Sequence, residues 1–455
     1  MRMLIQTQLS NYDASGKFIL ECDSGWQMVM GRVRIMLELD PDLHVDVIGP
    51  WRDEDDADGV GQLITHPFDI NPDLWGKHGP EGSKRLGYVP LWIEPNALAT
   101  RFNFDMDNYD WQLGLKEHRT HPSMRYDIVF INDPMHLRNF RALFHLRGGY
   151  TPKFVVHSHF IDNPSCPKFP TEASLWLGQC EAAIRADWNF WQCESSMQIF
   201  MGELGNTFAR PDLVWNTRAK SSPWDDGYSS QEINVPFETS RVRFDPYELA
   251  RLGQEKVIIF VPNRIGGLGR SSDYTNCGKF MFEHLPELAR LRASKTGDRD
   301  YVVICGNPSQ KILNSELTEL CGATGYHSLV PDVLRRDEFK AVASAAHVVV
   351  GLYTNDSYGG TVARECVDMG CLPFWADNYE YTSLAAEADW RHLTHPSLCR
   401  VPIDLSNLID DVRDPSSALD YFQGAKERLQ RVVRSRCSYE ETTGAAMRQM
   451  KGLLA

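Results

Sequence analysis

Short apolar runs alternate with amphipathic stretches along most of the chain. In the first half, the stretch Trp26–Leu39 has the apolar spacing of an amphipathic helix, and the apolar runs around it predict strands. The strands predicted in this half are Met3–Gln6, Val45–Ile48, Asp127–Ile131 and Phe154–Val156. Strands that recur with helices between them indicate a parallel sheet covered on both faces.

The same alternation begins again after a polar stretch at Asn216–Gln231. It predicts a helix at Lys279–Arg292, with Pro286 as the place for a kink, and a charged helical region from Asp420 onward. The strands predicted in this half are Val257–Val261, Tyr301–Cys305, His347–Leu352 and Leu372–Trp375. The whole pattern predicts an α/β protein with two Rossmann-like, doubly wound domains that face each other across a cleft.

The expected domain boundaries follow these changes in pattern. A chain of 455 residues is too long for one ordinary domain. We expect a first domain at 1–215, a connection at 216–240, a second domain at 241–420 and closing helices at 421–455. Ligands of doubly wound sheets bind at the carboxyl ends of the strands, where the strand order reverses, so functional residues are expected there.

The stretch Ala345–Trp375 contains the most informative local pattern, which is a strand, a polar glycine loop, a helix and another strand. The predicted helix starts near Gly360, carries Glu365 in its second turn and stops at Gly370. The free N–H groups of a helix N-terminus favour an anion, and a nearby carboxylate can accept hydrogen bonds from sugar hydroxyls. The pattern indicates a site for a diphosphate joined to a sugar or ribose.

Simpler interpretations of these residues stay open. Glu365 is also typical of an exposed residue that complements the helix dipole. In the loop before the helix, Asp356 and Ser357 are common helix caps as well as candidates to touch a sugar.

A second glycine-rich loop follows the predicted strand Val257–Val261. Arg264 comes directly after that strand, and Arg270 follows three glycines. Glycines let the backbone approach a ligand closely, and two arginines can neutralise a diphosphate with forked hydrogen bonds. A surface turn with solvated arginines explains the same residues. The loop is neither a P-loop, because it lacks the GK[ST] ending, nor a GxGxxG loop.

In the first half, the candidate chemistry lies around the predicted strand Phe154–Val156. His157 and His159 follow this strand, at the position where open α/β sheets present active groups. A histidine there can hydrogen-bond a hydroxyl or transfer a proton near neutral pH. Gly25, before the first predicted helix, either brings the backbone to a ligand or only opens the helix.

The net charge is −14, which opposes general binding to nucleic acid or to an anionic membrane. The segment Pro134–Ile161 is nevertheless free of acidic residues, and its basic residues alternate with aromatic ones. The basic members are Arg138, Arg141, Arg147 and Lys153, and the aromatic members are Phe140, Phe144, Tyr150 and Phe154. We call these eight residues the basic aromatic stripe. It predicts either a groove for a polyanion, with stacked bases, or an amphipathic helix with a solvated basic face.

Cysteine usage and hydropathy indicate a cytoplasmic location. The 11 cysteines are scattered and include no CxxC, which is typical of reduced, packed thiols. The N-terminal sequence does not predict a signal peptide, and no run of apolar residues is long enough for a membrane span. Metal patterns are poor, because Asp105 and Asp107 form a DxD in a polar segment and not at the end of an apolar strand. We therefore expect no metal requirement.

In this order, the motifs resemble those of the GT-B glycosyltransferases, most nearly the retaining family 4 type. The resemblance covers most of the chain loosely and the second half best. The motifs that carry it are KFVVHSHF, FWQCESSMQIF, PNRIGGLGR, YVVICGNP, SYGGTVARECVDMGCLP and CSYEETTGAAMRQM. The resemblance implies two Rossmann-like domains and a last helix that often crosses back to the first domain. It also implies a UDP- or GDP-sugar as co-substrate.

The resemblance also assigns roles to residues of the second half. Arg264 and Arg270 would bind the donor diphosphate, with Lys279 as a rival for the second cation. The backbone of Gly360 and Thr361 would face phosphate or sugar.

The remaining roles concern the two sugars of the donor. Glu365 would accept the ribose hydroxyls, and His159 would contact the transferred sugar. The family's first acid, eight positions before Glu365, falls on Ser357, so Asp356 takes that role only if the loop is one residue longer.

The sequence thus predicts a glycosyltransferase that moves a sugar from a nucleotide-sugar to a hydroxyl acceptor, with retention and without metal. The basic aromatic stripe adds a hydroxymethylated base in DNA, as in virus-type DNA modification, as a candidate acceptor. A sugar-nucleotide epimerase on the same fold and a non-catalytic partner subunit, suggested by Ser357, are the alternatives.

Overall fold

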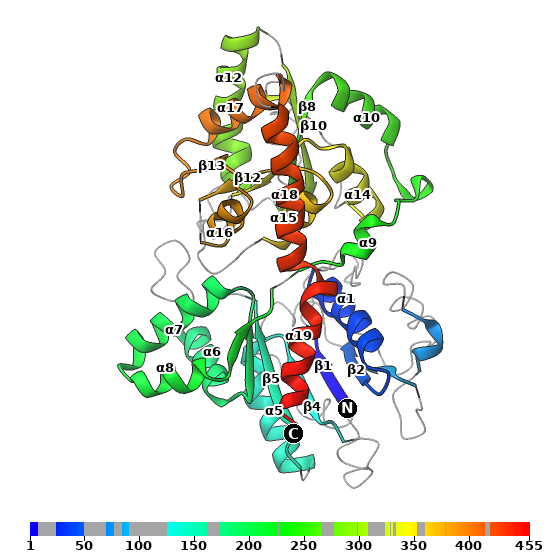
Figure 1. The fold of residues 1–455 in the computed structure, drawn as a ribbon, viewed down its shortest axis with the longest axis vertical. Coiled ribbons are helices and arrows are strands. Elements are labelled where there is room, and N and C mark those ends of the chain that lie inside the picture. Colours follow the sequence, from blue (N-terminus) through cyan, green and yellow to red (C-terminus); the bar gives the residue numbers. More distant parts are fainter. Residues whose placement is uncertain are drawn as a thin grey trace. The chain divides into compact units, whose positions relative to one another are not determined.

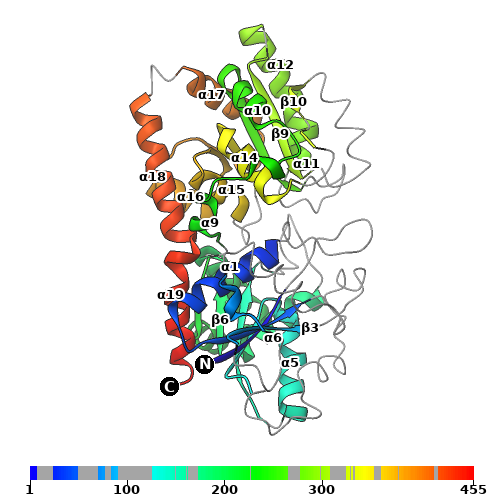
Figure 2. The same cartoon turned by 90° about the vertical axis from the view of Figure 1, so that its right-hand side faces the viewer.

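The computed structural model divides into two compact units, each described separately below (Figures 1 and 2). Unit 1 comprises Met1–Ser165, Pro170–Tyr228 and Tyr439–Ala455, and unit 2 comprises Cys166–Phe169 and Ser229–Ser438. The structure describes residues 1–7, 24–49, 70–76, 84–90, 125–148, 150–159, 161, 173–225, 227–264, 277–297, 299–307, 324–327, 329–330, 334–352, 360–377, 379–414 and 419–455.

The described strands of unit 1 form one parallel sheet in the order β3-β2-β1-β4-β5-β6-β7. The order reverses between β1 and β4, which is the switch point of a doubly wound fold. The strands are β1 (Arg2–Gln6), β2 (His44–Gly49), β3 (Leu86–Pro90), β4 (Ile128–Ile131), β5 (Lys153–Ser158), β6 (Trp188–Trp191) and β7 (Ser221–Pro223). The α-helices are α1 (Ser24–Leu39), α5 (Leu137–Leu143), α6 (Ala173–Arg185), α7 (Glu194–Phe208), α8 (Pro211–Arg218) and α19 (Tyr439–Gly452).

The helix α19 packs against α1 in unit 1, although the two lie at opposite ends of the sequence (Figure 1). A Cβ atom at Gly31 of α1 would lie 2.6 Å from the ring of Tyr439, so only glycine admits this ring. Met447 and Met450 of α19 are buried in the same core as Val29 and Val33 of α1. The sheet of unit 1 is therefore covered in part by the last helix of the chain.

Unit 2 repeats the architecture with a smaller parallel sheet in the order β10-β9-β8-β11-β12-β13. Here the order reverses between β8 and β11. The described strands are β8 (Val257–Arg264), β9 (Tyr301–Asn307), β10 (Tyr326–His327), β11 (Val348–Gly351), β12 (Leu372–Ala376) and β13 (Leu393–Thr394). The described α-helices are α9 (Ser230–Asn234), α10 (Pro246–Glu255), α11 (Cys277–Lys279), α12 (Leu285–Thr296), α14 (Arg336–Ala345), α15 (Thr361–Asp368), α16 (Tyr379–Glu387), α17 (Val401–Arg413) and α18 (Leu419–Cys437).

Two parallel-sheet α/β units confirm the predicted fold class. The helix expected at Lys279–Arg292 is interrupted by a π-helical turn, Phe280–His284, immediately before Pro286. Proline cannot donate its backbone hydrogen bond, and the wide turn accommodates it. The segment expected to connect the halves, 216–240, contributes the edge strand β7 to unit 1 and the helix α9 to unit 2.

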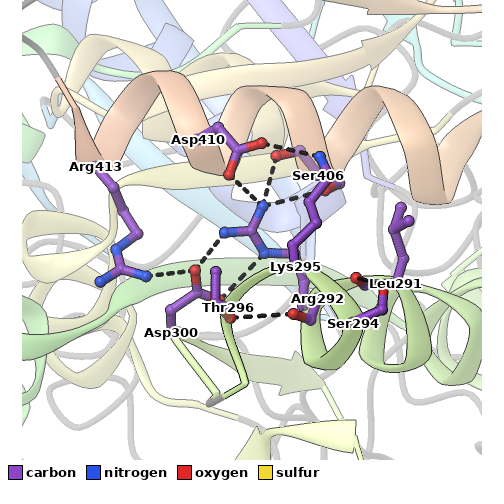
Figure 3. Close-up of polar contacts among 9 residues, drawn as sticks. All are labelled: Leu291, Arg292, Ser294, Lys295, Thr296, Asp300, Ser406, Asp410 and Arg413. Carbon is purple, nitrogen blue, oxygen red and sulfur yellow. Dashed lines mark hydrogen bonds and ion pairs between the residues drawn. The ribbon is translucent and has the colours of Figure 1, made fainter.

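The amino edge of the unit 2 sheet is held by a cluster around Arg292 (Figure 3). We call Arg292, Lys295, Asp300, Ser406, Asp410 and Arg413 the amino-edge cluster. Arg292 pairs with Asp300, just before β9, and with Asp410 of α17. Its Nη1 also donates to the backbone oxygen and the hydroxyl of Ser406, each at 3.1 Å. These bonds fasten α12 and α17 to the start of β9.

The basic aromatic stripe does not form a base-stacking surface. Phe140, Phe144 and Phe154 are fully buried in the core between the unit 1 sheet and α5. Arg141 lies over the Phe154 ring at 5.4 Å and donates to the backbone of Arg185. The stacking interpretation is wrong, because Phe140 of α5, Phe144 of the π-helical turn after it and Phe154 of β5 all lie in this core. Within the described part of the chain, no helix is long and apolar enough to span a membrane.

Candidate functional site

The carboxyl edge of the unit 2 sheet places several predicted residues at the switch point. β8 ends at Arg264, whose backbone lies opposite Asn307 at the end of β9. β11, the neighbour of β8 on the other side of the switch point, ends at Gly351. A helix that connects parallel strands runs antiparallel to them, so α14 and α15 both begin at this same edge.

The predicted helix is α15, with Gly360 as its N-cap residue and Gly370, at φ 107°, just beyond its end. Gly360 is buried, and its carbonyl accepts a hydrogen bond from the Tyr381 hydroxyl at 3.3 Å. A Cβ atom at Gly351 would lie 2.8 Å from the Trp375 ring and 3.2 Å from Cβ of Ala363, so this glycine lets α15 lie close to the strand. The N-cap residue Gly360 has no side chain to cap the first turn of α15, and the N–H groups of a helix N-terminus are suited to an anion.

Glu365 lies in the second turn of α15 and is engaged in an ion-pair cluster. Its side chain is 7% exposed, and Oε1 accepts a hydrogen bond from Nη2 of Arg336, the first residue of α14. The same Nη2 also pairs with Glu232 of α9, and Arg336 Nε lies 3.0 and 3.1 Å from the two Glu232 oxygens. Nζ of Lys340 is 3.2 Å from Glu232. We call Glu232, Arg336, Lys340 and Glu365 the carboxyl-edge cluster.

Burial and charge act in opposite directions on the two carboxylates of this cluster. Burial raises the pKa of Glu365, and the opposing charge of Arg336 does not fully offset it. Burial would also raise the pKa of Glu232, but the charges and hydrogen bonds of Arg336 and Lys340 outweigh burial and lower that pKa. Glu232 is therefore the firmly ionised anchor of the cluster, and Glu365 is its more easily protonated member.

A second face of α15 is fixed by buried polar contacts to α16 and α18. Arg364 is fully buried; its Nη1 lies 3.2 Å from Sγ of Cys437 and 4.0 Å from Glu380. Glu380 also pairs with Arg436 at 3.2 Å. A helix held on both sides keeps its first turn and Glu365 in a defined position.

In unit 1, the predicted histidine pair lies at the carboxyl end of β5. His157 is fully buried, with Nε2 3.0 Å from the carbonyl oxygen of Trp224 and Nδ1 3.3 Å from Nη1 of Arg32. Because a carbonyl only accepts and a guanidinium only donates, His157 carries its proton on Nε2. His159 is half-buried, and its Nε2 lies 3.4 Å from Nδ1 of His157. Arg32 and Trp224 were missed because neither has a strand-end or loop signal.

The other predicted residues are placed as follows. Lys279 is exposed at the end of α11, Thr361 is half-exposed as the first residue of α15, and Gly25 is half-buried in the first turn of α1. Asp356, Ser357, Arg270, Asp105 and Asp107 lie outside the described residues. Among the residues that the structure describes, no group of three or more histidines, cysteines and acids is arranged to hold a metal ion.

Arg336, like Glu232 and Lys340, is a residue of this edge that the sequence analysis missed. It comes from Arg335–Glu338, a stretch with neither glycine nor an apolar strand in front of it. A weak signal was present, because a basic residue opens a helix whose next two residues are acidic.

No family model and no curated protein matches the sequence. Solved structures match its fold over nearly the whole chain at low identity. HepE of Anabaena in complex with UDP-glucose is 12% identical, with a TM-score of 0.60 over 99% of this chain and 100% of that one. The trehalose-6-phosphate synthase OtsA is 13% identical, with a TM-score of 0.64 over 99% of each chain.

A sucrose-phosphate synthase from Thermosynechococcus elongatus is also similar, at 13% identity and a TM-score of 0.60 over 100% of this chain and 99% of that one. Likeness at this level of identity concerns the fold. The chain has the GT-B fold of these glycosyltransferases.

Proposed function

We propose that the protein is a glycosyltransferase that moves a sugar from a nucleotide-sugar donor to a hydroxyl acceptor. The observation that carries the proposal is the carboxyl edge of the unit 2 sheet. There, β8 ends in Arg264 beside the switch point, and α15 begins at the same edge with Gly360 as its N-cap residue and the buried Glu365. This arrangement suits a diphosphate and a ribose together.

The proposed chemistry follows from the charges at this edge. Arg264 and the amides of Gly360 and Thr361 stabilise the diphosphate as negative charge develops on it. The bond between the sugar carbon and the phosphate oxygen breaks, and a bond from the acceptor oxygen to that carbon forms. With retention, a phosphate oxygen on the leaving-group side takes the acceptor proton. Glu365 accepts the ribose hydroxyls, and Arg270 or Lys279 supplies the second cation for the diphosphate.

In unit 1, we assign the contact with the transferred sugar to His159, as the resemblance implies. Its neighbour His157 is fixed by Trp224 and Arg32, which limits the orientations of the His159 ring. Asp356, outside the described residues, and Gly25 keep their predicted roles near the sugar and the first helix.

The acceptor is proposed to be a neutral hydroxyl compound. At the unit 1 switch point, Gln6 Oε1 accepts the backbone N–H groups of Asn132 and Asp133, each at 3.0 Å. Oδ1 of Asn132 is buried there with no hydrogen-bond partner in the described part of the chain. An unsatisfied amide oxygen favours a hydroxyl donor.

Only the basic residues of the stripe still support a DNA acceptor, because the phenylalanines of the stripe lie in the core. If the protein does not bind hydroxymethylated DNA duplex at low salt, the hypothesis of a DNA acceptor is wrong. Product analysis without an acceptor distinguishes a sugar-nucleotide epimerase from the proposed glycosyltransferase. A non-catalytic subunit would show no slow hydrolysis of the donor.

The test is substitution of Arg264 and Glu365 by alanine, with UDP-glucose, which HepE binds, as the first donor assayed. Each variant should lose sugar transfer by about 100-fold or more, because charge stabilisation of the leaving group or donor positioning is lost. The matched control is Arg251→Ala on α10, whose side chain is 69% exposed, and it should retain full turnover. Near-normal turnover in both test variants would refute the proposed site.

A further inference from the structure

Arg336 occupies a position that local preference disfavours. It is the first residue of α14, where the helix dipole favours negative charge. The next two residues, Asp337 and Glu338, obey this preference, and Glu338 also accepts the backbone N–H of Arg335 at 2.8 Å. A residue that breaks a local rule inside an otherwise regular helix start marks a place where another interaction decides the sequence.

That interaction is the bridge between two carboxylates on different elements. Nη2 of Arg336 contacts both Glu232 of α9 and Glu365 of α15, and Nε is directed to Glu232 alone. Lys340, one turn along α14, holds Glu232 from a second side. Arg336 is therefore fixed in place by Glu232 through Nε and Nη2, and its Nη2 is shared with Glu365.

The two oxygens of Glu365 differ in their contacts. Oε1 is bonded to Arg336, whereas no hydrogen bond from the described residues reaches Oε2. Arg336 is itself 27% exposed, so the cluster is in contact with solvent. A carboxylate held by one oxygen can present the other in a fixed direction to hydroxyl donors.

We propose that Arg336 is a positioning residue for the donor, which holds Oε1 of Glu365 so that Oε2 meets the ribose hydroxyls. The inference rests on the proposed function, since it assigns Glu365 to the ribose. Arg336 acts through Glu365. Without Arg336, the buried carboxylate has neither its partner nor its fixed direction, and the preference for ribose over deoxyribose is lost.

The experiment compares the affinities of UDP and 2′-deoxy-UDP, or of GDP and 2′-deoxy-GDP if the guanine nucleotide is the one that binds. Wild-type protein should prefer the ribose form by ~10–100-fold, the effect of one hydrogen bond to a charged group. Arg336→Gln should reduce the preference to about twofold or less, by weakening binding of the ribose form more than that of the deoxy form. Arg336→Lys should restore part of the preference, because it restores the charge without the fork.

The matched control is Arg292→Gln in the amino-edge cluster, which also bridges two carboxylates but at the other edge of the sheet. It should lower stability and leave the ribose preference unchanged. If Arg336→Gln unfolds the protein, the test depends on Arg336→Lys alone. A ribose preference in Arg336→Lys equal to that of wild type would then overturn the inference. A folded Arg336→Gln with wild-type preference overturns it as well.

Failure of the proposed function gives a different result. In that case wild-type protein binds neither nucleotide, or binds ribose and deoxyribose forms equally while Glu365→Gln changes nothing. If Glu365→Gln abolishes the preference and Arg336→Gln does not, the proposed site stands and the role of Arg336 falls.

Discussion

The two edges of the unit 2 sheet each contain an arginine between two carboxylates, and the two arginines differ in placement. Arg292 lies near the C-terminal end of α12, where the helix dipole favours a cation, and its side chain is 2% exposed. Arg336 opens α14, where the dipole disfavours a cation, and is 27% exposed. The arginine of the amino-edge cluster thus lies in the C-terminal part of its helix and is almost fully buried, whereas the arginine of the carboxyl-edge cluster opens its helix and is partly exposed.

The two clusters also differ in the number of cations that each carboxylate receives from the described residues. At the amino edge, both Asp300 and Asp410 receive two cationic partners each. At the carboxyl edge, Glu232 receives two and Glu365 only one. In doubly wound sheets the carboxyl edge is the ligand edge, so the spare capacity of Glu365 lies where a ligand is expected. We therefore propose that similar ion-pair chemistry stabilises the fold at the amino edge and positions a ligand at the carboxyl edge.

The largest effect on stability is expected from Arg292→Ala. Removal of this cation leaves Asp300 and Asp410 with one partner each, and Asp300 is deeply buried. Breaking a buried pair from one side costs about 3–5 kcal/mol of unfolding free energy. Urea unfolding should show this loss, while nucleotide affinity of the folded protein stays at the wild-type value. A stability loss below that of Arg336→Ala would contradict the contrast between the edges.

As the pH falls, Glu365 of the carboxyl-edge cluster should be protonated before Asp300 of the amino-edge cluster. Burial raises the pKa of Glu365 above its ordinary 4.5. Burial would also raise the pKa of Asp300, but its hydrogen bonds to Arg292 and Arg413 lower it below 3.8. A carboxyl group whose pKa is lowered in the folded protein stabilises the fold at pH values above its ordinary pKa. That stability is lost as the pH falls through the pKa of the folded state. The raised pKa of Glu365 has the opposite sign, so its protonation does not destabilise the fold.

Ribose preference should therefore disappear on acidification before the stability contributed by the amino-edge cluster does. Parallel measurement of nucleotide affinity and of the urea midpoint from pH 7 downward checks this order. The ribose preference and the urea midpoint could instead fall together, both in wild type and in Glu365→Gln. That result would show that the carboxyl-edge cluster has no separate titration.

The smallest effect is expected from Arg413→Ala. This arginine pairs with Asp300 from the solvent side, and its side chain is 43% exposed. A partly exposed partner contributes at most about 1 kcal/mol, because water screens it and Arg292 still holds Asp300. Urea unfolding should place this variant close to wild type and far from Arg292→Ala. Equal losses in the two variants would mean that burial does not decide the strength of these pairs.

The fold was predictable because apolar runs separated by amphipathic stretches identify parallel α/β sheets. The strand Trp188–Trp191 was not named as one, because WNFW is short and contains a polar residue whose side chain bonds the backbone of Ala183. The sequence left two interpretations of the basic aromatic stripe open, because alternation with basic residues looks the same whether the rings face solvent or core. The structure places Phe140, Phe144 and Phe154 in the core.

The placement of Arg264, Gly360 and Glu365 at the carboxyl edge was predictable, because it depends on strand ends and helix starts. The candidate site was not predictable where it depends on contacts between distant segments. Glu232 and Arg336 are far apart in sequence, and Arg292 and Asp410 are farther still. Only the arrangement of the helices shows which of these arginines lies beside the proposed ligand.

The packing of α19 against α1 has a consequence for synthesis. The ring of Tyr439 fills the space left by Gly31, yet it leaves the ribosome only after all of unit 2 has been made. Unit 2 is contiguous between Ser229 and Ser438, so it can acquire its full sheet while the nascent first unit still lacks a covering helix. Unit 1, whose first residues are translated first, is thus the last unit to be completed.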